Sequence, residues 1–560
     1  MAKKTPFDSG TKTVRLKWWK ILWRVLVGRT IPQKLFRAYI VVIFLGSILL
    51  YLPISLQHGY TMVLDNDVNT RTYTYWDAFF IGVSAITNTG LTPAVISETL
   101  TTFGQVVMVV LMEFGGLGLM TIIYLIWNLF RFKNKESNLN QIIMLQSERG
   151  NAKIAGTFKS LKVSVSFILI CQIVFMFLYS FWLCWMPVYQ QIPATFDGNN
   201  ISTISSLTTD GTEKIAAYGH YGTALWQGLF FTVSSINNAG FDNFNGGVSI
   251  AAFRNDWNVV FQVMVLCQII IGGIGFPLIY DVIEKIRCKH KGIPYKLTLF
   301  GKVALISYIV VGLITAAAAF GFEYGYTGYQ SVSVINNDSL SVSIQSVPIY
   351  DIAHYKEYAS EFGKNVTFNK CWAIFFNSMA TRSAGVGTIN QSILAPGSQW
   401  LYIVTMFIGG SPSSTAGGIR TTTLAIIMIT ILAKIKGRKD VNIFHRKIPV
   451  ETVRESFLVT LTAVMLVAIS AIVIFYTLSN QGDSPEQYTV LQCVYEATSA
   501  FGTVGFSMGI TSYINHFGQI VLCLIMFVGQ LGVSSMLLSW TRKNPKGNRV
   551  YYPEEDIRIG

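Results

Sequence analysis

The fold is decided by four similar stretches: Trp76-DAFFIGVSAITNTGLT-Pro93, Trp226-QGLFFTVSSINNAGF-Asp242, Trp372-AIFFNSMATRSAGVGT-Ile389 and Leu491-QCVYEATSAFGTVGFS-Met508. Each is apolar, too short to cross a membrane, and runs into a turn with a Ser or Thr and a central glycine. Lipid tolerates such a turn at membrane depth only where it lines a cavity inside the protein. The four stretches are therefore predicted to be re-entrant pore helices.

Glycines cluster again in the apolar stretch that follows each pore helix. The clusters begin 25, 32, 24 and 24 residues after the central glycine, at Gly115, Gly272, Gly409 and Gly529. A repeat of this size predicts one unit, a helix, a re-entrant helix with its turn and a second helix, used four times. Close packing of neighbouring helices is an alternative reason for the cluster glycines.

The composition is that of a membrane bundle. Of the 560 residues, 51% are hydrophobic and 13% are charged, and the mean hydropathy is +0.45. A soluble protein with these values would expose too much apolar surface, and a disordered chain carries far more charge. A helix needs about 20 apolar residues to cross the bilayer. Eight stretches qualify: 38–57, 104–130, 161–186, 257–283, 299–322, 399–433, 456–479 and 516–540.

These observations predict an all-α polytopic membrane protein with eight transmembrane helices and four tandem helix–pore-helix–helix repeats around one central pore. The repeats are placed at 38–130, 161–285, 299–435 (with an intramembrane loop) and 456–541. The remaining segments are a basic arm at 1–37, loops at 131–160, 286–298 and 436–455, and a tail at 542–560.

The basic residues indicate how the chain is oriented. Of the 43 Lys and Arg, 35 fall in segments 1–37, 131–162, 284–302 and 434–454 and in the tail after Trp540, which alternate crossings place on one face. The positive-inside rule therefore predicts a multi-pass plasma-membrane protein with both termini in the cytoplasm. Segment 1–37 lacks the short apolar region and cleavage site of a signal peptide, so we expect it to be retained.

The turns after the pore helices are the candidate ion site. Glycine permits backbone conformations that aim carbonyl oxygens at an axis, and a ring of carbonyls can replace the hydration shell of a monovalent cation. The dipole of each pore helix adds negative potential at the centre. The predicted ion-binding residues are Asn88, Thr89, Gly90, Asn238, Ala239, Gly240, Ala384, Gly385, Val504 and Gly505. Glycines that merely let helices pack are the alternative.

The sixth apolar stretch is interrupted at 409–418 by glycines, a proline and hydroxyl residues, which cannot hold a lipid-facing helix. Arg420 follows directly, and an arginine at membrane depth is a functional candidate because its burial is costly. A static kink, with Arg420 reaching toward the interface, is the alternative.

At this point the chain resembles the Trk/Ktr/HKT superfamily of potassium transporters, in particular the KtrB type of membrane subunit. The resemblance rests on Ser499-AFGTV-Gly505, Ile236-NNAG-Phe241, Thr381-RSA-Gly385 and Gly409-GSPSSTAGGI-Arg420. It implies a filter selective for K⁺ when all four central positions are glycine. Relatives with serine in the first turn admit or prefer Na⁺, so Gly90 favours K⁺.

The resemblance also implies that the interrupting segment is a gate beneath the filter. The gate residues are Gly409, Gly410, Ser411, Ser413, Ser414, Thr415, Gly417, Gly418 and Arg420. Arg382 lies three residues before Gly385 and would repel K⁺ unless a carboxylate neutralised it. We therefore predict that Arg382 pairs with Glu496 or Asp242 and supports the filter.

Two positions depart from the family pattern. Gln530 stands where relatives carry an arginine, and Glu113 places a carboxyl group in the middle of the second apolar stretch. Glu113 is either neutral and satisfied by a polar neighbour or changes gating or ion coupling. The sequence leaves both interpretations open.

The remaining expectations concern partners and alternative functions. Cysteines and histidines are scattered, so neither an enzyme nor a metal site other than K⁺ is expected. The chain lacks nucleotide-binding motifs. The resemblance implies a homodimer with a cytoplasmic KtrA-like nucleotide-binding ring, and the basic face also suits anionic lipids rather than nucleic acid. K⁺ is the expected cargo, with Na⁺ or H⁺ open as a coupling ion. A Na⁺ transporter and the pore subunit of an ATP-driven K⁺ complex are the alternatives.

Overall fold

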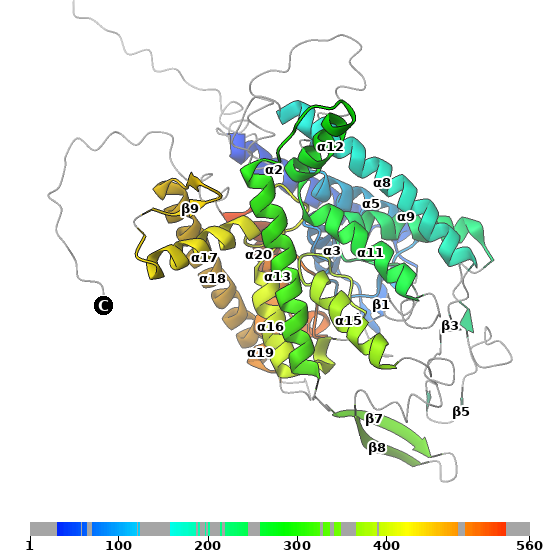
Figure 1. Cartoon of the computed structure of the whole chain (residues 1–560). Helices are drawn as coiled ribbons and strands as arrows, with labels where there is room; N and C mark the ends of the chain where they lie inside the picture. The colour runs from blue at the N-terminus through cyan, green and yellow to red at the C-terminus, as the bar shows by residue number, and fades with distance from the viewer. Residues whose placement is uncertain are drawn as a thin grey trace, which may run out of the picture.

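The computed structural model describes residues 31–57, 59–63, 70–119, 121–123, 157–185, 219–244, 258–324, 366–388, 391–438, 440–479 and 488–533, together with short strands at 189–190, 196–197, 200–201, 213–214, 329–336 and 341–348. These residues form a bundle that is mostly helical, as the sequence predicts (Figure 1).

The helices follow the repeating order expected from the sequence. In each unit a first helix leads to a short re-entrant helix and then to a third helix, which is broken in two in the second and third units. The units are α2 (Ile31–Tyr51), α3 (Tyr75–Ile86) and α5 (Thr102–Gly116); α8 (Thr157–Trp185), α9 (Tyr221–Ile236), α11 (Asn258–Gly273) and α12 (Phe276–His290); α13 (Leu299–Glu323), α15 (Val366–Ala380), α16 (Pro396–Phe407) and α17 (Thr421–Ile435); and α18 (Val450–Ser479), α19 (Val490–Gly502) and α20 (His516–Leu531).

Small elements connect the helices. The short helices are η1 (Pro53–Ser55), α4 (Ile96–Thr99), η2 (Gln391–Ile393) and η3 (Thr511–Tyr513). The strands form antiparallel pairs that the sequence analysis did not predict: β1 (Thr61–Val63) with β2 (Thr70–Thr72), β3 (Tyr189–Gln190) with β6 (Glu213–Lys214), β4 (Phe196–Asp197) with β5 (Asn200–Ile201), β7 (Tyr329–Asn336) with β8 (Ser341–Pro348), and β9 (Asn442–Ile443) with β10 (Arg446–Lys447).

Side-chain caps fix where two of the re-entrant helices begin. Thr74 and Asp77 form a capping box at α3, in which the Asp77 carboxylate accepts from the backbone N–H of Thr74 at 2.9 Å. Thr489 and Gln492 form the same arrangement at α19. Asp77 also pairs with Arg71 at 2.6 Å. Each cap satisfies N–H groups that a helix start would otherwise leave unpaired.

The units pack as a closed ring. Within a unit, the first helix packs along its own re-entrant helix: α2 on α3, α8 on α9, α13 on α15 and α18 on α19. Between units, the third helix contacts the re-entrant helix of the next unit. These contacts are α5 with α9, α11 with α15, α16 with α19, and α20 with α3, which returns to the first unit. The order of the chain is therefore also the order around the axis.

The glycine clusters end helices instead of lying inside continuous spans. The sequence predicted one span at 257–283, but α11 ends at Gly273 and α12 leaves at a bend of 102°. Gly275 between them has φ +83°, which a helix cannot contain, and a proline opens α12. Gly118 and Gly532 have φ +86° and +84° after α5 and α20. The predicted span is therefore a bent pair of helices and not one continuous helix, because the cluster supplies a left-handed residue.

The cluster glycines also permit close packing, as the alternative interpretation held. A Cβ added at Gly115, Gly272 or Gly529 would collide with the carbonyl oxygen of Ile86, Ile236 or Phe501. Each of these carbonyls lies four residues before a central glycine. The third helix of each of these units can therefore press on the end of its own re-entrant helix.

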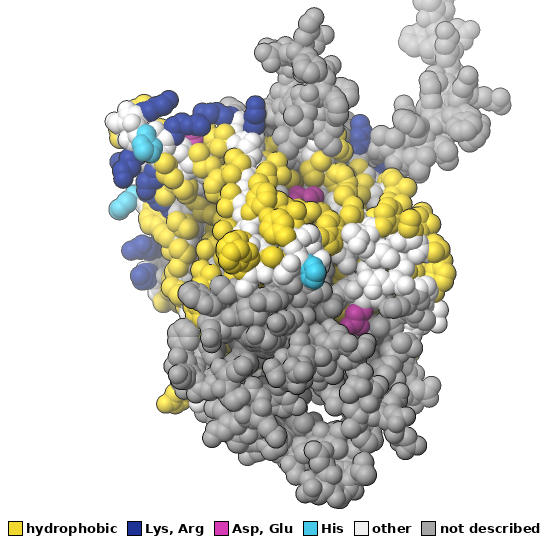
Figure 2. Space-filling model, turned by 90° about the vertical axis from the view of Figure 1, so that its right-hand side faces the viewer, with side chains coloured by type: hydrophobic (Ala, Val, Ile, Leu, Met, Phe, Trp, Pro, Cys, Tyr) yellow, Lys and Arg dark blue, Asp and Glu magenta, His cyan; other side chains and the backbone are white. Residues whose placement is uncertain are grey.

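The outer surface of the bundle suits a membrane. Among the described residues, Lys159–Trp185, Leu299–Glu323 and Val450–Ser479 are long and apolar enough to span a bilayer, and the bent pair Val259–Gly273 and Phe276–His290 makes a fourth span. The expectation of eight crossings and the segment boundaries stay predictions. Figure 2 shows a broad hydrophobic band, with Lys and Arg side chains gathered at one end of the described surface.

Candidate functional site

The four turns share one backbone conformation. The residue two positions before each central glycine has positive φ: Asn88 at +50°, Asn238 at +56°, Ser383 at +65° and Thr503 at +48°. The central glycines follow with φ values of +91° at Gly90, +74° at Gly240, +66° at Gly385 and +92° at Gly505. Positive φ is unusual for a residue other than glycine and is least expected at a β-branched residue such as Thr503. The shared conformation shows that the turns are built alike.

The central glycines meet one another. A Cβ added at Gly90 would lie 2.6 Å from Ala239 O, and one added at Gly240 would lie 2.7 Å from Gly385 Cα. The other two complete the circle: Gly385 faces Val504 O, and Gly505 faces Thr89 O. The sequence prediction that four distant glycines gather around one axis agrees with these contacts, and each position excludes a side chain for steric reasons.

The carbonyl that precedes each central glycine lies against the turn of the preceding unit in the circle. These are the carbonyls of Thr89, Ala239, Ala384 and Val504, which contact Gly505, Gly90, Gly240 and Gly385. Because glycine has no side chain, the four peptide units can lie this close together. Carbonyl oxygens are the ligands that replace water around a dehydrated monovalent cation.

Backbone hydrogen bonds hold three of the turns in the same way. The N–H of Thr89 donates to Ser84 O at 2.9 Å, that of Ala239 to Ser234 O at 2.7 Å, and that of Val504 to Ser499 O at 2.9 Å. In the third turn the N–H of Ala384 donates to Ala380 O at 3.3 Å instead. The serines at 84, 234 and 499 mark equivalent positions in the units.

The interrupting segment is a loop between α16 and α17 that closes on itself. Ile408 and Ile419 form a parallel bridge, in which the N–H of Gly409 donates to Ile419 O at 2.9 Å and that of Ile419 to Phe407 O at 3.1 Å. The N–H of Ser411 donates to Gly273 O at 3.0 Å, which ties the loop to the broken end of α11. The predicted helix break at 409–418 is therefore present, as a loop held by its own backbone hydrogen bonds.

This loop is hydrogen-bonded directly to the turns that follow the re-entrant helices. The N–H of Gly417 donates to Thr503 Oγ1 at 2.9 Å and to Ser383 Oγ at 3.2 Å, and Asn238 Nδ2 donates to Thr415 Oγ1 at 3.1 Å. Ser383 Oγ also donates to Thr503 O at 2.9 Å. Three of the four positive-φ residues therefore hold the loop with their side chains. Asn238 is among the ion-binding residues predicted from the sequence, whereas Ser383 and Thr503 are not.

Arg420 and Gln530 hold the other side of the loop. Arg420 donates to Ala416 O and, at 3.4 Å, to Gln530 O. Gln530 Nε2 donates to Thr415 O at 3.3 Å. Gln530 thus binds the loop through a neutral amide, and Arg420 supplies a positive charge at the same place.

The support predicted for Arg382 takes a different form. Arg382 is fully buried, its guanidinium lies 3.7 Å from the centroid of the Tyr308 ring, and it donates to Tyr308 O. Within the described residues, the expected ion pair with Glu496 or Asp242 is not formed. Glu496 instead accepts from Thr511 Oγ1, and Asp242 accepts from the N–H of Phe244 at 3.3 Å. The aromatic face of Tyr308 on α13 takes the place of a carboxylate.

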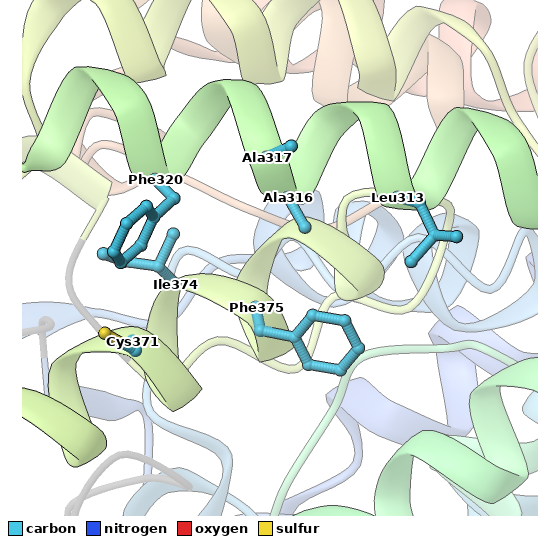
Figure 3. A pocket seen from close by; sticks show the side chains of 7 residues that line it. All are labelled: Leu313, Ala316, Ala317, Phe320, Cys371, Ile374 and Phe375. Carbon is cyan, nitrogen blue, oxygen red and sulfur yellow. The ribbon is translucent and has the colours of Figure 1, made fainter.

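A cavity of about 320 Å³ lies between α13 and α15 (Figure 3). Its lining is apolar apart from the Cys371 thiol: Leu313, Ala316, Ala317, Phe320, Cys371, Ile374 and Phe375. None of the predicted filter or gate residues lines it, so this cavity is not the candidate ion site.

The amino-acid sequence matches a known protein family. The family model described as a cation transport protein, TrkH, matches residues 36–552. The chain belongs to this family. An uncharacterized cation transporter of Mycoplasma genitalium is 35% identical over 98% of this chain and 100% of its own length.

Two further proteins that are similar to this chain are named for potassium uptake or transport. The Ktr system potassium uptake protein D of Bacillus subtilis is 28% identical, with 98% of this chain and 100% of that protein covered. The crystal structure of the potassium transporter TrkH from Vibrio parahaemolyticus has a similar fold, with a TM-score of 0.56, 13% identity, and coverage of 90% and 84%. This chain is therefore a multi-pass membrane protein of a transporter family and not an enzyme.

Proposed function

We propose that this chain takes up K⁺ across the plasma membrane through the ring of Gly90, Gly240, Gly385 and Gly505. The observation that carries the proposal is the closed circle of four glycines, each against a carbonyl or backbone atom of its neighbour. Relatives named as potassium uptake proteins cover nearly the whole chain, which supports K⁺ as the cargo. A relative named as a potassium/sodium uptake protein keeps Na⁺ as the second candidate.

We propose the loop at 409–418 as the gate. Its support is the set of hydrogen bonds from Gly417 and Thr415 to the filter turns, together with the anchor at Arg420 and Gln530. A path along the axis requires the loop to leave these positions. Opening requires the bonds at Gly417 to break, because they join the loop to two turns at once.

We also propose that the protein works as a dimer with a nucleotide-binding cytoplasmic ring and has both termini in the cytoplasm. Exposed basic residues lie at the C-terminal ends of α12 and α17 and just after them, on the face that the sequence assigns to the cytoplasm: Lys285, Arg287, Lys289, Lys291, Lys434, Lys436, Arg438, Arg446 and Lys447. This surface would attract an acidic protein or anionic lipid. Two relatives are named as parts of a Ktr system, which supports a partner subunit.

The test is growth of a bacterium that lacks its own K⁺ uptake, on low K⁺, with the chain and with Gly90→Ser and Gly385→Ser. Gly219→Ser is the matched control, because Gly219 also has positive φ, at +74°, but has open space around it. We expect the parent and the control to restore growth and the filter variants to lose selectivity. Absence of growth with the parent, even with a nucleotide-binding partner supplied, would contradict the proposed function.

A further inference from the structure

The proposed transport path does not use the Glu113 carboxyl, which lies in the middle of the bundle. Glu113 is on α5, the third helix of the first unit, and precedes the glycine cluster by two residues. Gln172 on α8 donates from Nε2 to Glu113 Oε1 at 2.6 Å. Oε2 is buried and, among the described residues, has no hydrogen-bond partner. One half of the carboxyl group is thus satisfied and the other half is not.

Asn237 faces the same carboxyl from α9. It is the last capping residue of the second re-entrant helix and directly precedes Asn238, the positive-φ residue of the second filter turn. Asn237 is fully buried, and within the described part of the chain both atoms of its side-chain amide also lack partners. Two incompletely satisfied polar groups therefore lie together beside the filter, although buried polar groups are almost always paired.

The surroundings of Glu113 are free of compensating charge. The groups that act on it from α8 and α9 are amides, and no charged side chain in the described ranges does so. Titratable groups of the other neighbouring helices are engaged elsewhere: Tyr39 of α2 accepts from the N–H of Leu119, and Asp77 of α3 pairs with Arg71. An ionised carboxylate without a cation in such a place is energetically costly.

Either a proton or a bound metal cation would remove this cost. The amide of Gln172 presents its N–H₂ and not its oxygen to Glu113, and in this orientation it is not a ligand for a metal ion. A proton needs only one acceptor, and Asn237 Oδ1 is available for it. The donors at hand therefore favour a proton over Na⁺.

We propose that Glu113 is a proton-binding site that controls the second filter turn. In the protonated form Oε2 donates toward Asn237 Oδ1. In the ionised form Oε2 can only accept, so Asn237 must present its Nδ2 and its amide must turn over. Gly116 confines this amide, since a Cβ at Gly116 would collide with Asn237 Oδ1. Because Asn237 directly precedes Asn238, rotation of its amide displaces the backbone of Asn238 and of the ring glycine Gly240.

This inference rests on the proposed K⁺ uptake, and its first test uses that activity. Rb⁺ uptake into liposomes containing the purified protein is measured across a pH series. We expect uptake by the parent to fall about fivefold or more as pH rises, the lower end of typical coupling between two sites. Glu113→Gln should remain at the acidic level throughout. Glu98→Gln, a change at an outer-side glutamate on α4, is the matched control and should keep the parent profile.

A second variant keeps the proposal testable if Glu113→Gln does not fold. The Gln172 N–H₂ group favours the ionised form, so Gln172→Met should shift the midpoint of the uptake profile to higher pH. A midpoint that does not move, or an identical pH profile in Glu113→Gln, would overturn the proposal. Replacing Na⁺ with a large organic cation should leave the profile unchanged. Na⁺ dependence that disappears in Glu113→Gln would instead establish a metal-cation site and refute a proton site.

Infrared difference spectroscopy separates this inference from the transport function. The purified parent should show a carboxylic acid C=O band that is lost on raising the pH and is missing in Glu113→Gln. If the parent does not take up Rb⁺, the proposed function fails, yet this band still decides whether Glu113 holds a proton. A parent that transports but lacks the band would overturn the proton site alone.

Discussion

Replacing Thr503 by valine should release the loop at 409–418 from the filter. Thr503 Oγ1 accepts from the N–H of Gly417 at 2.9 Å, and Ser383 Oγ, at 3.2 Å from the same nitrogen, is the remaining acceptor. Valine has the same shape and β-branching, so it introduces no new strain at φ +48°. The variant therefore removes hydrogen bonding and little else.

The size of the effect follows from the number of acceptors that remain. With Ser383 still present, the loop loses one net hydrogen bond, about 0.5–1.5 kcal/mol. The second bond of Thr503 Oγ1, to Ser383 Oγ at 3.0 Å, joins the two turns and not the loop. This corresponds to a shift of about 2- to 13-fold in the ratio of released to bound loop. In Ser383→Ala/Thr503→Val the N–H of Gly417 loses both acceptors, and burying it unpaired costs about 1–3 kcal/mol, or about 5- to 160-fold.

The assay is Rb⁺ uptake by liposomes that contain the chain without a cytoplasmic partner. Uptake should rise in Thr503→Val and rise further in the double variant. Thr498→Val is the control, because Thr498 bonds only to Val494 O in its own helix, at 2.7 Å. The melting temperatures of the variants are compared with that of the parent. If they are equal and uptake is unchanged or reduced in both variants, these bonds have no role in closing the pore.

Three further predictions concern packing. Gly240→Ala should abolish uptake, because its Cβ would lie 2.7 Å from Gly385 Cα, whereas Gly219→Ala, with open space, should not; uptake in Gly240→Ala equal to the control would contradict the ring. Gly115→Ala should lower the stability of the purified protein by about 1–3 kcal/mol, read from thermal unfolding, since its Cβ would strike Ile86 O; Gly321→Ala on α13 has room and should be neutral. Arg382 contacts both the ring and the backbone carbonyl of Tyr308. Tyr308→Phe keeps the ring and should be tolerated, whereas Tyr308→Leu should lower both stability and uptake. Equal effects of the two changes would show that the ring contact does not matter.

Local patterns explain why the fold was predictable. The glycines at 90, 240, 385 and 505 follow apolar stretches too short to span a bilayer, and this combination has few solutions in lipid. Their gathering around one axis follows from using the same unit four times. The break before Arg420 was likewise visible in the composition of 409–418.

Other features depend on contacts between distant segments and could not be read from the chain. The prediction that Arg382 needs a carboxylate was reasonable from charge alone, but Tyr308, 74 residues earlier, provides an aromatic face and a carbonyl. The hydrogen bonds from Gly417 to Ser383 and Thr503 join parts of two units. One signal was available: Ser383 and Thr503 occupy the positions of Asn88 and Asn238, two before the central glycine.

The break between α11 and α12 shows how spacing can mislead. The interval of 257–283 has the length and hydropathy of one span, and length was taken as the deciding feature. The glycine three residues after the start of the cluster was the better signal. It recurs at Gly118, Gly275 and Gly532, each with positive φ.

The central claim is that the ring of four glycines binds the transported ion, and heavy-ion crystallography tests it most directly. Crystals of the protein grown in Rb⁺ or Tl⁺ would be examined for anomalous scattering along the axis. The account predicts a peak between Gly90, Gly240, Gly385 and Gly505, beside the carbonyls of Thr89, Ala239, Ala384 and Val504, that is absent in Gly385→Ser. A well-ordered ring without a peak, or a peak only at another place in the bundle, would contradict it.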